Sequence, residues 1–361
     1  MKRFVFIAQI LLIVFIMASC DQSSQDGKVF HVDKYDYKDW SKLVDVKEAI
    51  QLQENDQCLM SYAAKCIVLD DIIIYQDYKA KRIYAFSKDG KYLYTIGNLG
   101  HATSEYTSIR DFCVDEKSSA VMVLDDRGVI CYNLRNGKFM ERKKLSSPNP
   151  GEYEKMGYVG NSEFIFFTND INDNTIVSDS QSGVKGLREG KRFHFVLSPF
   201  YEYNKEHRVL ADYGDFYIDN YKNGKLETLY SIDLGKDALP SDVLPKTFEE
   251  FQAVDNSADH FKCIADGQEN TDWLYLTVVG PKQEYYVGFF NKQNGTYAFG
   301  SNRESFEIAV IGAKNDCFYG IIYPEYASPN SVAKKILKDY EIDASKNSPV
   351  IVKFKINEKA I

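Results

Sequence analysis

The sequence lacks several features that would assign it to a common functional class. It has no block of Lys or Arg beyond Lys2–Arg3, and its formal net charge is −8. Because a groove that neutralises phosphates needs a basic stripe, nucleic acid is excluded as a partner. The His-Glu-x-x-His, Gly-x-Ser-x-Gly and P-loop patterns are absent, which disfavours the protease, hydrolase and nucleotide-binding classes. The five histidines are scattered, without ligand-like neighbours.

A long apolar run is also lacking, but a short one begins the chain. A basic start, an apolar run over residues 4–17 and the sequence Met-Ala-Ser-Cys follow one another. Fourteen residues fall short of the roughly 20 that a spanning helix needs, and the order is that of a secretory signal. The ending resembles a bacterial lipobox, which makes Cys20 the lipidated residue. We therefore expect a signal peptide over 1–19, a lipidated Cys and polar tether over 20–44, and an outer-membrane lipoprotein of the cell envelope.

Cysteine pairs with Cys-x-x-Cys spacing are missing as well, so neither zinc nor redox chemistry is indicated. An even number of cysteines after Cys20 permits disulfides in an exported chain. Four of these six lie in hydrophobic, strand-like runs, which favours buried free thiols there: Cys66, Cys113, Cys131 and Cys317.

Tight-turn dipeptides recur along the chain, and each follows a strand-like run. The pairs end at Gly90, Gly137, Gly183, Gly224 and Gly295, so the intervals are 47, 46, 41 and 71 residues. Such pairs supply the positive φ angles of tight hairpins. A period near 45 predicts a repeated sheet of four strands, as in a propeller blade.

The stretch "GNLGHATSEYTSIRDF" is part of this repeat. With an offset of 47, Glu105 and Tyr106 align with Glu152 and Tyr153, and Glu202-Tyr203 is a third, weaker copy. A phosphate cradle would need a helix after its glycines, but β-branched strand-like runs follow. We interpret these four residues as the structural link between consecutive blades.

The strand-like segments predict an all-β fold in which six four-stranded antiparallel blades form one propeller over residues 45–361. The last blade lacks a strand unless "EAIQLQ" near the N-terminus joins the C-terminal "PVIVKFKI". Pairing the two ends would close the ring and remove a free edge. Short helical insertions are expected, one of them after Ser331, with Val332, Ile336 and Tyr340 on one face. That helix packs across a blade or covers a binding face as a lid.

These segments resemble the six-bladed β-propeller lipoproteins of Bacteroidota, a group distantly similar to NHL-type propellers. The resemblance rests on "RIYAFSKDGKYLYTIG", "LSPFYEY", "LYSIDLGKDALP" and "NSPVIVKFKI", and on the link "SEYTSIRDFCVD", where the family commonly has Gly-Pro-Gly-Glu-Tyr. It implies the fold and export, and it supplies no catalytic residues. Ala102-Thr103-Ser104 in place of Gly-Pro-Gly favours a structural turn at this link.

Candidate ligand-binding residues lie at strand ends, where propeller side chains can face the channel mouth. They are Arg110, Asp111, Asp125, Asp126 and Arg127. The competing interpretation is that the acids cap turns and pair with a neighbouring Arg. "DINDNT", residues 170–175, has the alternating acids and amides of a calcium loop but not its glycine or final Glu. We therefore expect no resident metal or cofactor, with calcium as an alternative.

Two functions are consistent with these features. The first is a lipid-anchored extracytoplasmic binding or scaffold propeller without catalysis, whose ligand is a glycan or a partner protein. Its basis is the export signal, the missing catalytic motifs and the abundance of tyrosine, 26 residues, because aromatic faces suit sugars and peptides. The alternative is a hydrolase or lyase that uses channel-mouth carboxylates, with or without calcium. It requires Asp111, Asp125 and Asp126 to converge in one pocket.

Overall fold

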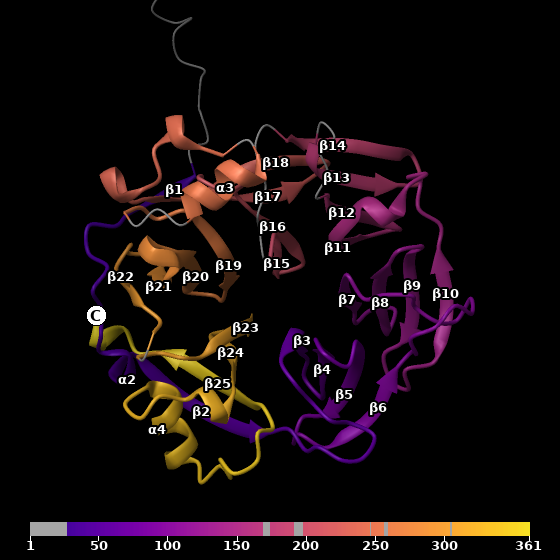
Figure 1. Cartoon of the computed structure of the whole chain (residues 1–361), viewed down its shortest axis with the longest axis horizontal. Coiled ribbons are helices and arrows are strands. Elements are labelled where there is room, and N and C mark those ends of the chain that lie inside the picture. The colour runs from indigo at the N-terminus through magenta and orange to yellow at the C-terminus, as the bar shows by residue number, and fades with distance from the viewer. Residues whose placement is uncertain (1–26, 169–173, 191–197, 246, 256–258, 304) are drawn as a thin grey trace, which may run out of the picture.

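A computed structural model describes residues 27–168, 174–190, 198–245, 247–255, 259–303 and 305–361. Six sheets stand around a central axis (Figure 1), and five of them have four strands. The predicted all-β, six-bladed propeller is therefore confirmed. The first blade consists of β3 (Ala63–Val68), β4 (Ile72–Asp77), β5 (Arg82–Ser87) and β6 (Tyr92–Ile96). The second consists of β7 (Asp111–Asp115), β8 (Ala120–Asp125), β9 (Gly128–Asn133) and β10 (Phe139–Lys143). The third consists of β11 (Tyr153–Gly160), β12 (Glu163–Thr168), β13 (Asn174–Ser180) and β14 (Gly183–Glu189).

The last three blades follow the same order from the axis outwards. The fourth blade consists of β15 (Phe200–Tyr203), β16 (Glu206–Leu210), β17 (Tyr217–Lys222) and β18 (Lys225–Asp233). The fifth consists of β19 (Cys263–Glu269), β20 (Trp273–Val279), β21 (Tyr285–Asn291) and β22 (Tyr297–Ser301). The sixth consists of β23 (Ala309–Lys314), β24 (Cys317–Ile322), β25 (Val350–Ile356) and β2 (Val44–Gln51). The short helices are α2 (Trp40–Leu43), α3 (Phe248–Asp255), α4 (Val332–Asp339), η1 (Pro150–Glu152), η2 (Gly235–Asp237), η3 (Ser241–Val243), η4 (Pro281–Gln283), η5 (Pro324–Tyr326) and η6 (Glu358–Ala360). Among the described helices, none is long and apolar enough to cross a membrane.

The two ends of the chain close the ring. Strand β2 pairs antiparallel with β25, which places Val46 opposite Phe354 and Gln51 opposite Val350. Strand β2 is thus the outermost strand of the sixth blade, beside the last strand of the chain (Figure 1). This pairing confirms the predicted closure and leaves no gap between first and last blade.

The turn glycines mark the same hairpin in each of the first five blades, between its third and fourth strands. All five have the positive φ that the sequence predicts, from 67° at Gly137 to 118° at Gly183. At Gly137 a Cβ would also lie 2.4 Å from the Thr95 carbonyl oxygen of the preceding blade. The sixth blade has no such turn, because its third and fourth strands, β25 and β2, come from opposite ends of the chain.

Residues 28–44 correct the expected polar tether. Strand β1 (Lys28–His31) adds to the fourth blade, parallel to β18, with Phe30 opposite Ile232. Phe30 and Trp40 are buried, at 2% and 0% exposure. The polar residues after Cys20 suggested a segment with nothing to bury, but these two aromatic side chains complete hydrophobic clusters of the ring. The propeller therefore includes residues that we had assigned to the tether.

The hydrophobic core lies between adjacent blades. The cluster between the first two blades, for example, joins Ile74 and Ile83 to Val121 and Val123. Two flat sheets cannot bury their faces alone, so this inter-blade packing holds the ring together.

Helix α4 begins after Ser331, whose Oγ accepts a hydrogen bond from the Lys334 amide at 3.1 Å, as the sequence predicts for an N-cap. Val332 and Ile336 are buried in the core of the last two blades. The helix lies on the outer side of the sixth blade (Figure 1). The lid interpretation of this helix is therefore wrong.

Candidate functional site: the central cavity

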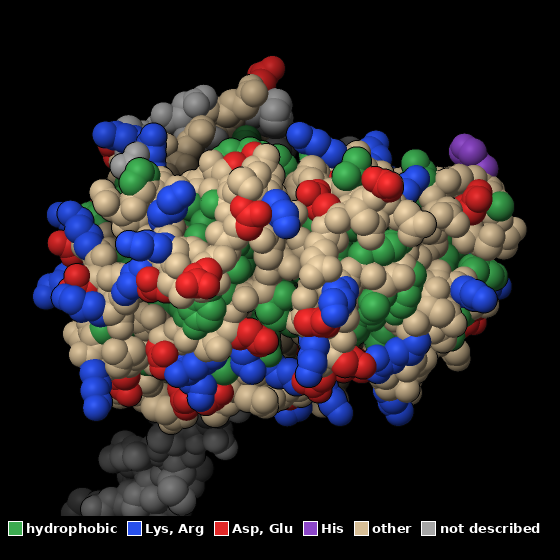
Figure 2. Space-filling view, turned by 90° about the horizontal axis from the view of Figure 1, so that it is seen from below, with side chains coloured by type: hydrophobic (Ala, Val, Ile, Leu, Met, Phe, Trp, Pro, Cys, Tyr) green, Lys and Arg blue, Asp and Glu red, His purple; other side chains and the backbone are tan. Residues whose placement is uncertain are grey.

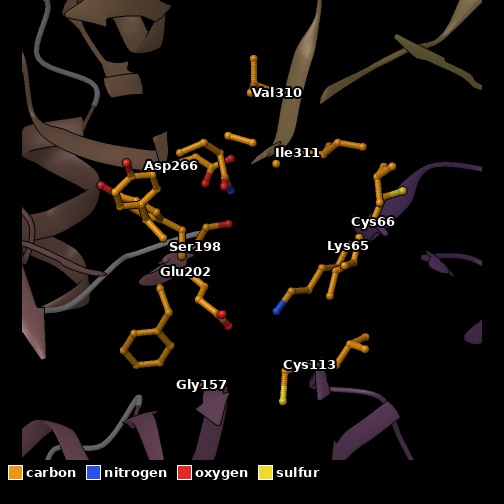
Figure 3. Close-up of a pocket in the computed structure, with 18 of the residues that line it drawn as sticks. Lys65, Cys66, Cys113, Gly157, Ser198, Glu202, Asp266, Val310 and Ile311 are labelled. Carbon is orange, nitrogen blue, oxygen red and sulfur yellow. The ribbon is translucent and has the colours of Figure 1, made fainter. Parts of the chain in front are cut away.

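A cavity of about 710 Å³ lies within the ring of inner strands. Residues of β3, β7, β11, β15, β19 and β23 all line it, so every blade contributes its first strand. This volume falls in the range of pockets that bind small molecules, about 300–1,000 Å³. The inner strands surround the centre of the view in Figure 1, and part of the cavity lining is drawn in Figure 3.

Lys65 and Asp111 form one ion pair of the cavity wall, with Nζ and Oδ1 2.8 Å apart. The Asp111 side chain also accepts hydrogen bonds from the amides of Phe112, at 2.8 Å, and Met156, at 2.9 Å. It therefore ties three consecutive blades together. Lys65 and the two amides therefore balance the charge of Asp111 within the protein.

Two further carboxylates face the cavity without a cationic partner among the described residues. Glu202 is on β15, and no ion pair or hydrogen bond engages its carboxylate. Asp266 on β19 accepts one hydrogen bond, from the Gly267 amide to Oδ1 at 2.8 Å. Figure 3 shows both carboxylates and the Lys65 ammonium pointing into the same open space.

The pKa values of these two acids are raised. Burial, followed by the nearby charges of Glu116 and Asp115, raises the pKa of Glu202. Burial raises the pKa of Asp266 to about 7, against the opposing effects of the Gly267 amide and of Lys65. Desolvation disfavours the charged form of a carboxyl group. Raised pKa values of this kind gather at functional sites.

His207 and Glu269 also belong to the wall, but protein groups satisfy them. His207 Nε2 lies 2.8 Å from the Tyr158 carbonyl oxygen, and burial lowers its pKa, so the ring is neutral at pH 7. Glu269 is fully buried and accepts from Arg208 Nε at 2.8 Å and from Tyr230 Oη at 3.0 Å. These residues build the wall and leave no free charge for a ligand.

Tyrosines surround one end of the cavity. Tyr62 and Tyr323 line it, and their ring centroids are 5.5 Å apart. Tyr326, which is 54% exposed, lies 5.6 Å from Tyr62 and shares a hydrogen bond between the two hydroxyl groups. Together Tyr62, Tyr323 and Tyr326 form a tyrosine group at the junction of the first and sixth blades.

The predicted site residue Asp125 has a structural role in the interior of the protein. It is fully buried and accepts two hydrogen bonds from Arg142, at 3.0 and 2.9 Å, and others from the amides of Thr107 and Arg127, at 3.2 and 2.9 Å. Burial opposes its ionisation, but the bonds from Arg142 and the two amides prevail and lower its pKa. Arg127 in turn donates to the carbonyl oxygen of His101 at 3.1 Å.

Arg110 and Asp126 form a more exposed pair at the same blade edge. Arg110 Nε donates to Asp126 Oδ1 at 3.0 Å, and its Nη1 donates to Glu154 Oε1 at 2.9 Å. Among the five candidate residues only Asp111 lines the cavity as described. Asp111, Asp125 and Asp126 therefore do not converge in one pocket, and the turn-capping interpretation describes the last two.

The link residues have the structural surroundings that the repeat suggests. Glu105 Oε2 accepts from the Ala102 amide at 3.0 Å, and Tyr106 is fully buried. In the next link, Glu152 Oε1 accepts from Asn149 Nδ2 at 3.3 Å. Tyr153 stacks on Phe166 with centroids 3.9 Å apart and donates to Asp179 at 3.1 Å.

The metal and thiol predictions have separate outcomes. Residues 169–173 of the calcium-loop candidate lie outside the described residues. Within the described ranges, no group of three or more His, Cys, Asp or Glu side chains could hold a metal ion. The six cysteines after Cys20 are free thiols. Cys66 and Cys113 line the cavity, and burial raises the pKa of both.

The sequence reasoning missed Lys65, Glu202 and Asp266 as cavity residues. A usable signal was present, because each is a charged residue that follows an apolar residue within a first strand, as in "AAKCIV" and "CIADGQE". A charge in that position needs either a partner or a cavity. Glu202 had been noted only as a weak copy of the repeat link.

Charged side chains of both signs share the surface at the edge of the ring (Figure 2). On the edge of the ring in Figure 2, Lys and Arg alternate with Asp and Glu, and no basic stripe crosses this face. A field of single sign, which steers polyanions, is absent from this view.

Comparison with known proteins identifies the family and the fold. A crystal structure of a Bacteroides fragilis protein described as exported has a TM-score of 0.71 and 14% identity, covering 92% of this chain and 99% of that one. A DUF4221 family member from Bacteroides vulgatus has a TM-score of 0.60 and 11% identity, covering 88% and 99%. No curated protein matches the sequence. The family model "Domain of unknown function (DUF4934)" matches residues 29–359, and the chain belongs to this family.

Proposed function

We propose that the protein is a binding propeller that holds a polar ligand, of saccharide type, in its central cavity without chemical turnover. The observation that carries this proposal is the cavity itself, about 710 Å³ in volume and lined by the first strand of every blade. Strands form most of its wall, which favours a preformed site. The engagement of Asp111, Asp125 and Asp126 inside the protein supports binding over catalysis.

The tyrosine group supports a saccharide as the ligand. Tyrosine offers a flat apolar face and a hydroxyl, which match the two kinds of surface on a sugar ring. Tyr62 and Tyr323 line the cavity, and Tyr326 extends the aromatic surface outwards. A glycan end can stack on this group while its hydroxyls reach the polar wall.

A direct test is titration of the purified protein with saccharides, followed by calorimetry or by ligand-detected NMR. Tyr62→Ala is expected to weaken binding by roughly 0.5–1.5 kcal/mol, the value of an aromatic contact beyond its buried area. Tyr340→Ala is the matched control, because Tyr340 is 39% exposed and follows α4 on the outer side of the ring. If both variants bind as the wild type does, the tyrosine group has no role in recognition.

A hydrolase or lyase is the second candidate, and one observation favours it. Glu202 and Asp266 share the cavity and both have raised pKa values. Glycosidases use a pair of carboxyl groups, one of them kept protonated by such a shift. Reducing-end assays on the saccharides that bind decide between the two functions, because turnover would refute binding alone.

We also propose that the protein is an outer-membrane lipoprotein attached through Cys20. The basic start, the short apolar run and the Met-Ala-Ser-Cys sequence support this proposal, as does the similarity in fold to a Bacteroides protein described as exported. Several acyl chains on one cysteine would hold the protein at a membrane. Cys20 lies outside the described residues.

The anchor is tested by labelling cells with a palmitate analogue. The wild type is expected to carry the label and to enter the membrane fraction, whereas Cys20→Ala should do neither. Equal labelling of both proteins, or none of the wild type, would show that residues 1–19 are an ordinary signal or an uncleaved anchor.

A further inference from the structure

The charged groups that line the cavity divide into paired and unpaired ones. Lys65 pairs with Asp111 at 2.8 Å, and Lys314 pairs with Asp70 at 2.8 Å. Glu269 is held by Arg208 and Lys292, at 2.8 and 3.4 Å. These contacts neutralise most of the wall without a ligand.

Three carboxylates of the lining have no cation among the described residues: Glu116, Glu202 and Asp266. One lysine of the lining, Lys155, also lacks a carboxylate there, and its Nζ contacts the Arg110 carbonyl oxygen at 3.4 Å. The wall therefore has an excess of negative charge. Asp266 is half-buried, whereas Glu116 and Glu202 are open to the solvent of the cavity. A buried carboxylate without a counter-ion is unfavourable, and such a group is retained at a position where a ligand compensates it.

Resting on the proposed function, we infer that the cavity selects a ligand bearing a protonated amine, which is held between the carboxylates of Glu202 and Asp266. These side chains come from the inner strands of neighbouring blades, the fourth and the fifth, and both point into the common space of Figure 3. An ammonium offers three donors, enough for both carboxylates and one further wall oxygen. Lys65 does not fill this position, because Asp111 engages it.

Lys155 gives the ligand a second contact. Its ammonium lies on β11, in the third blade, where it can donate to a hydroxyl or a carboxylate of the same ligand. The tyrosine group then contacts the apolar face of the ring. The ligand class is thus an amino sugar, with the free amine as the selected group.

The pH dependence of binding follows from the groups that face Asp266: Lys65 from β3, Tyr201 from β15 and Tyr275 from β20, together with the neighbouring Gly267 amide. Because burial raises the pKa of Asp266 to about 7, this carboxyl is protonated in acid and loses its attraction for an ammonium. Affinity for an amine that stays protonated over this range, such as the ε-ammonium of lysine amide, should therefore fall as the pH drops from 8 to 6. Asp266→Asn should weaken this dependence.

The experiment compares two probes that differ only in the amine: chitobiose, which has free amines, and its N,N′-diacetylated form. The purified protein is expected to bind chitobiose at least ten-fold more tightly at pH 7, where its amines are largely protonated. Glu202→Gln and Asp266→Asn should each reduce this preference by roughly ten-fold, the effect of one lost charged hydrogen bond. Glu48→Gln, an exposed acid of the outermost strand β2, is the charge-matched control and should leave the preference unchanged. Thermal melts verify that each variant is folded.

The outcomes separate this inference from the proposed function. Equal affinity for the two sugars would refute amine selection while saccharide binding stands. Carboxylate-dependent binding of lysine amide, with neither sugar bound, would support amine selection and refute the saccharide. Displacement of the amine by calcium at stoichiometric concentration would assign the carboxylates to a metal ion and overturn the inference.

Discussion

Replacement of Asp125 by Ala should destabilise the propeller more than any other change among the predicted site residues. The carboxylate is fully buried and accepts hydrogen bonds from Arg142 and from the amides of Thr107 and Arg127. Without it, two backbone donors lose their acceptor and the Arg142 guanidinium, 19% exposed, loses its counter-ion. Removal of one partner from a buried ion pair costs about 3–5 kcal/mol.

The effect of this replacement should depend on pH in a defined direction. The hydrogen bonds to Asp125 hold its pKa below the ordinary value despite burial. A carboxyl group with a lowered pKa in the folded state stabilises the protein above its unfolded pKa, about 3.9, and loses this contribution as the pH falls through the folded value. The difference between wild type and Asp125→Ala should therefore be full at pH 7 and should shrink below about pH 4.

Urea unfolding measures this difference, with the fluorescence of the buried Trp40 and Trp273 as the signal. The control is Asp126→Ala, because Asp126 is the next residue, 49% exposed, and pairs with Arg110 at the surface. An exposed pair of this kind contributes at most about 1 kcal/mol. If Asp125→Ala lowers the free energy of unfolding at pH 7 no more than Asp126→Ala does, Asp125 does not stabilise the fold, and it becomes a candidate ligand-binding residue again.

Three further changes test the fold and the cavity. Asp266→Asn should raise the free energy of unfolding at pH 8 but not at pH 4, because a carboxyl with a raised pKa makes the folded state less stable as the pH rises from 4 through 7. An equal effect at pH 8 and pH 4 in urea titrations would contradict burial of this acid. Ser331→Ala should cost about 1 kcal/mol in thermal unfolding through loss of the N-cap of α4, and no change would mean that water replaces the cap. Deletion of residues 27–51 removes β2 and frees the edge of β25, so gel filtration should show aggregation; a stable monomer would show that ring closure is dispensable.

The sequence predicted the number of blades because that information is local. A positive φ at a turn glycine such as Gly137 and the continuous apolar run in "AVMVLD" depend on neighbouring residues alone. The N-cap at Ser331 and the helix after it are local in the same sense. The pairing of β2 with β25 could also be predicted, because the last blade has only three strands in the C-terminal part of the sequence and needs a fourth from the N-terminal part.

The tether prediction failed because local composition was the wrong measure. Residues after Cys20 are polar, yet Phe30 and Trp40 are buried against blades that are distant in sequence. A single apolar residue in a polar segment has no periodicity, and its burial depends on which surface the chain passes. Only the assembled ring offers those surfaces.

By itself the sequence determined the repeated sheets, their turns and their assembly into a six-bladed propeller. The tertiary structure decided which charged residues form internal ion pairs and which face the cavity. Asp125 and Asp266 both follow a run of apolar residues in a strand, but Arg142 reaches Asp125, whereas no described cation pairs with Asp266. The partner of a buried carboxylate comes from another strand or blade, as Lys65 does for Asp111 across 46 residues. The electrostatic environment of each acid is therefore a property of the closed ring, since the strand sequence alone does not specify which side chains the ring brings together.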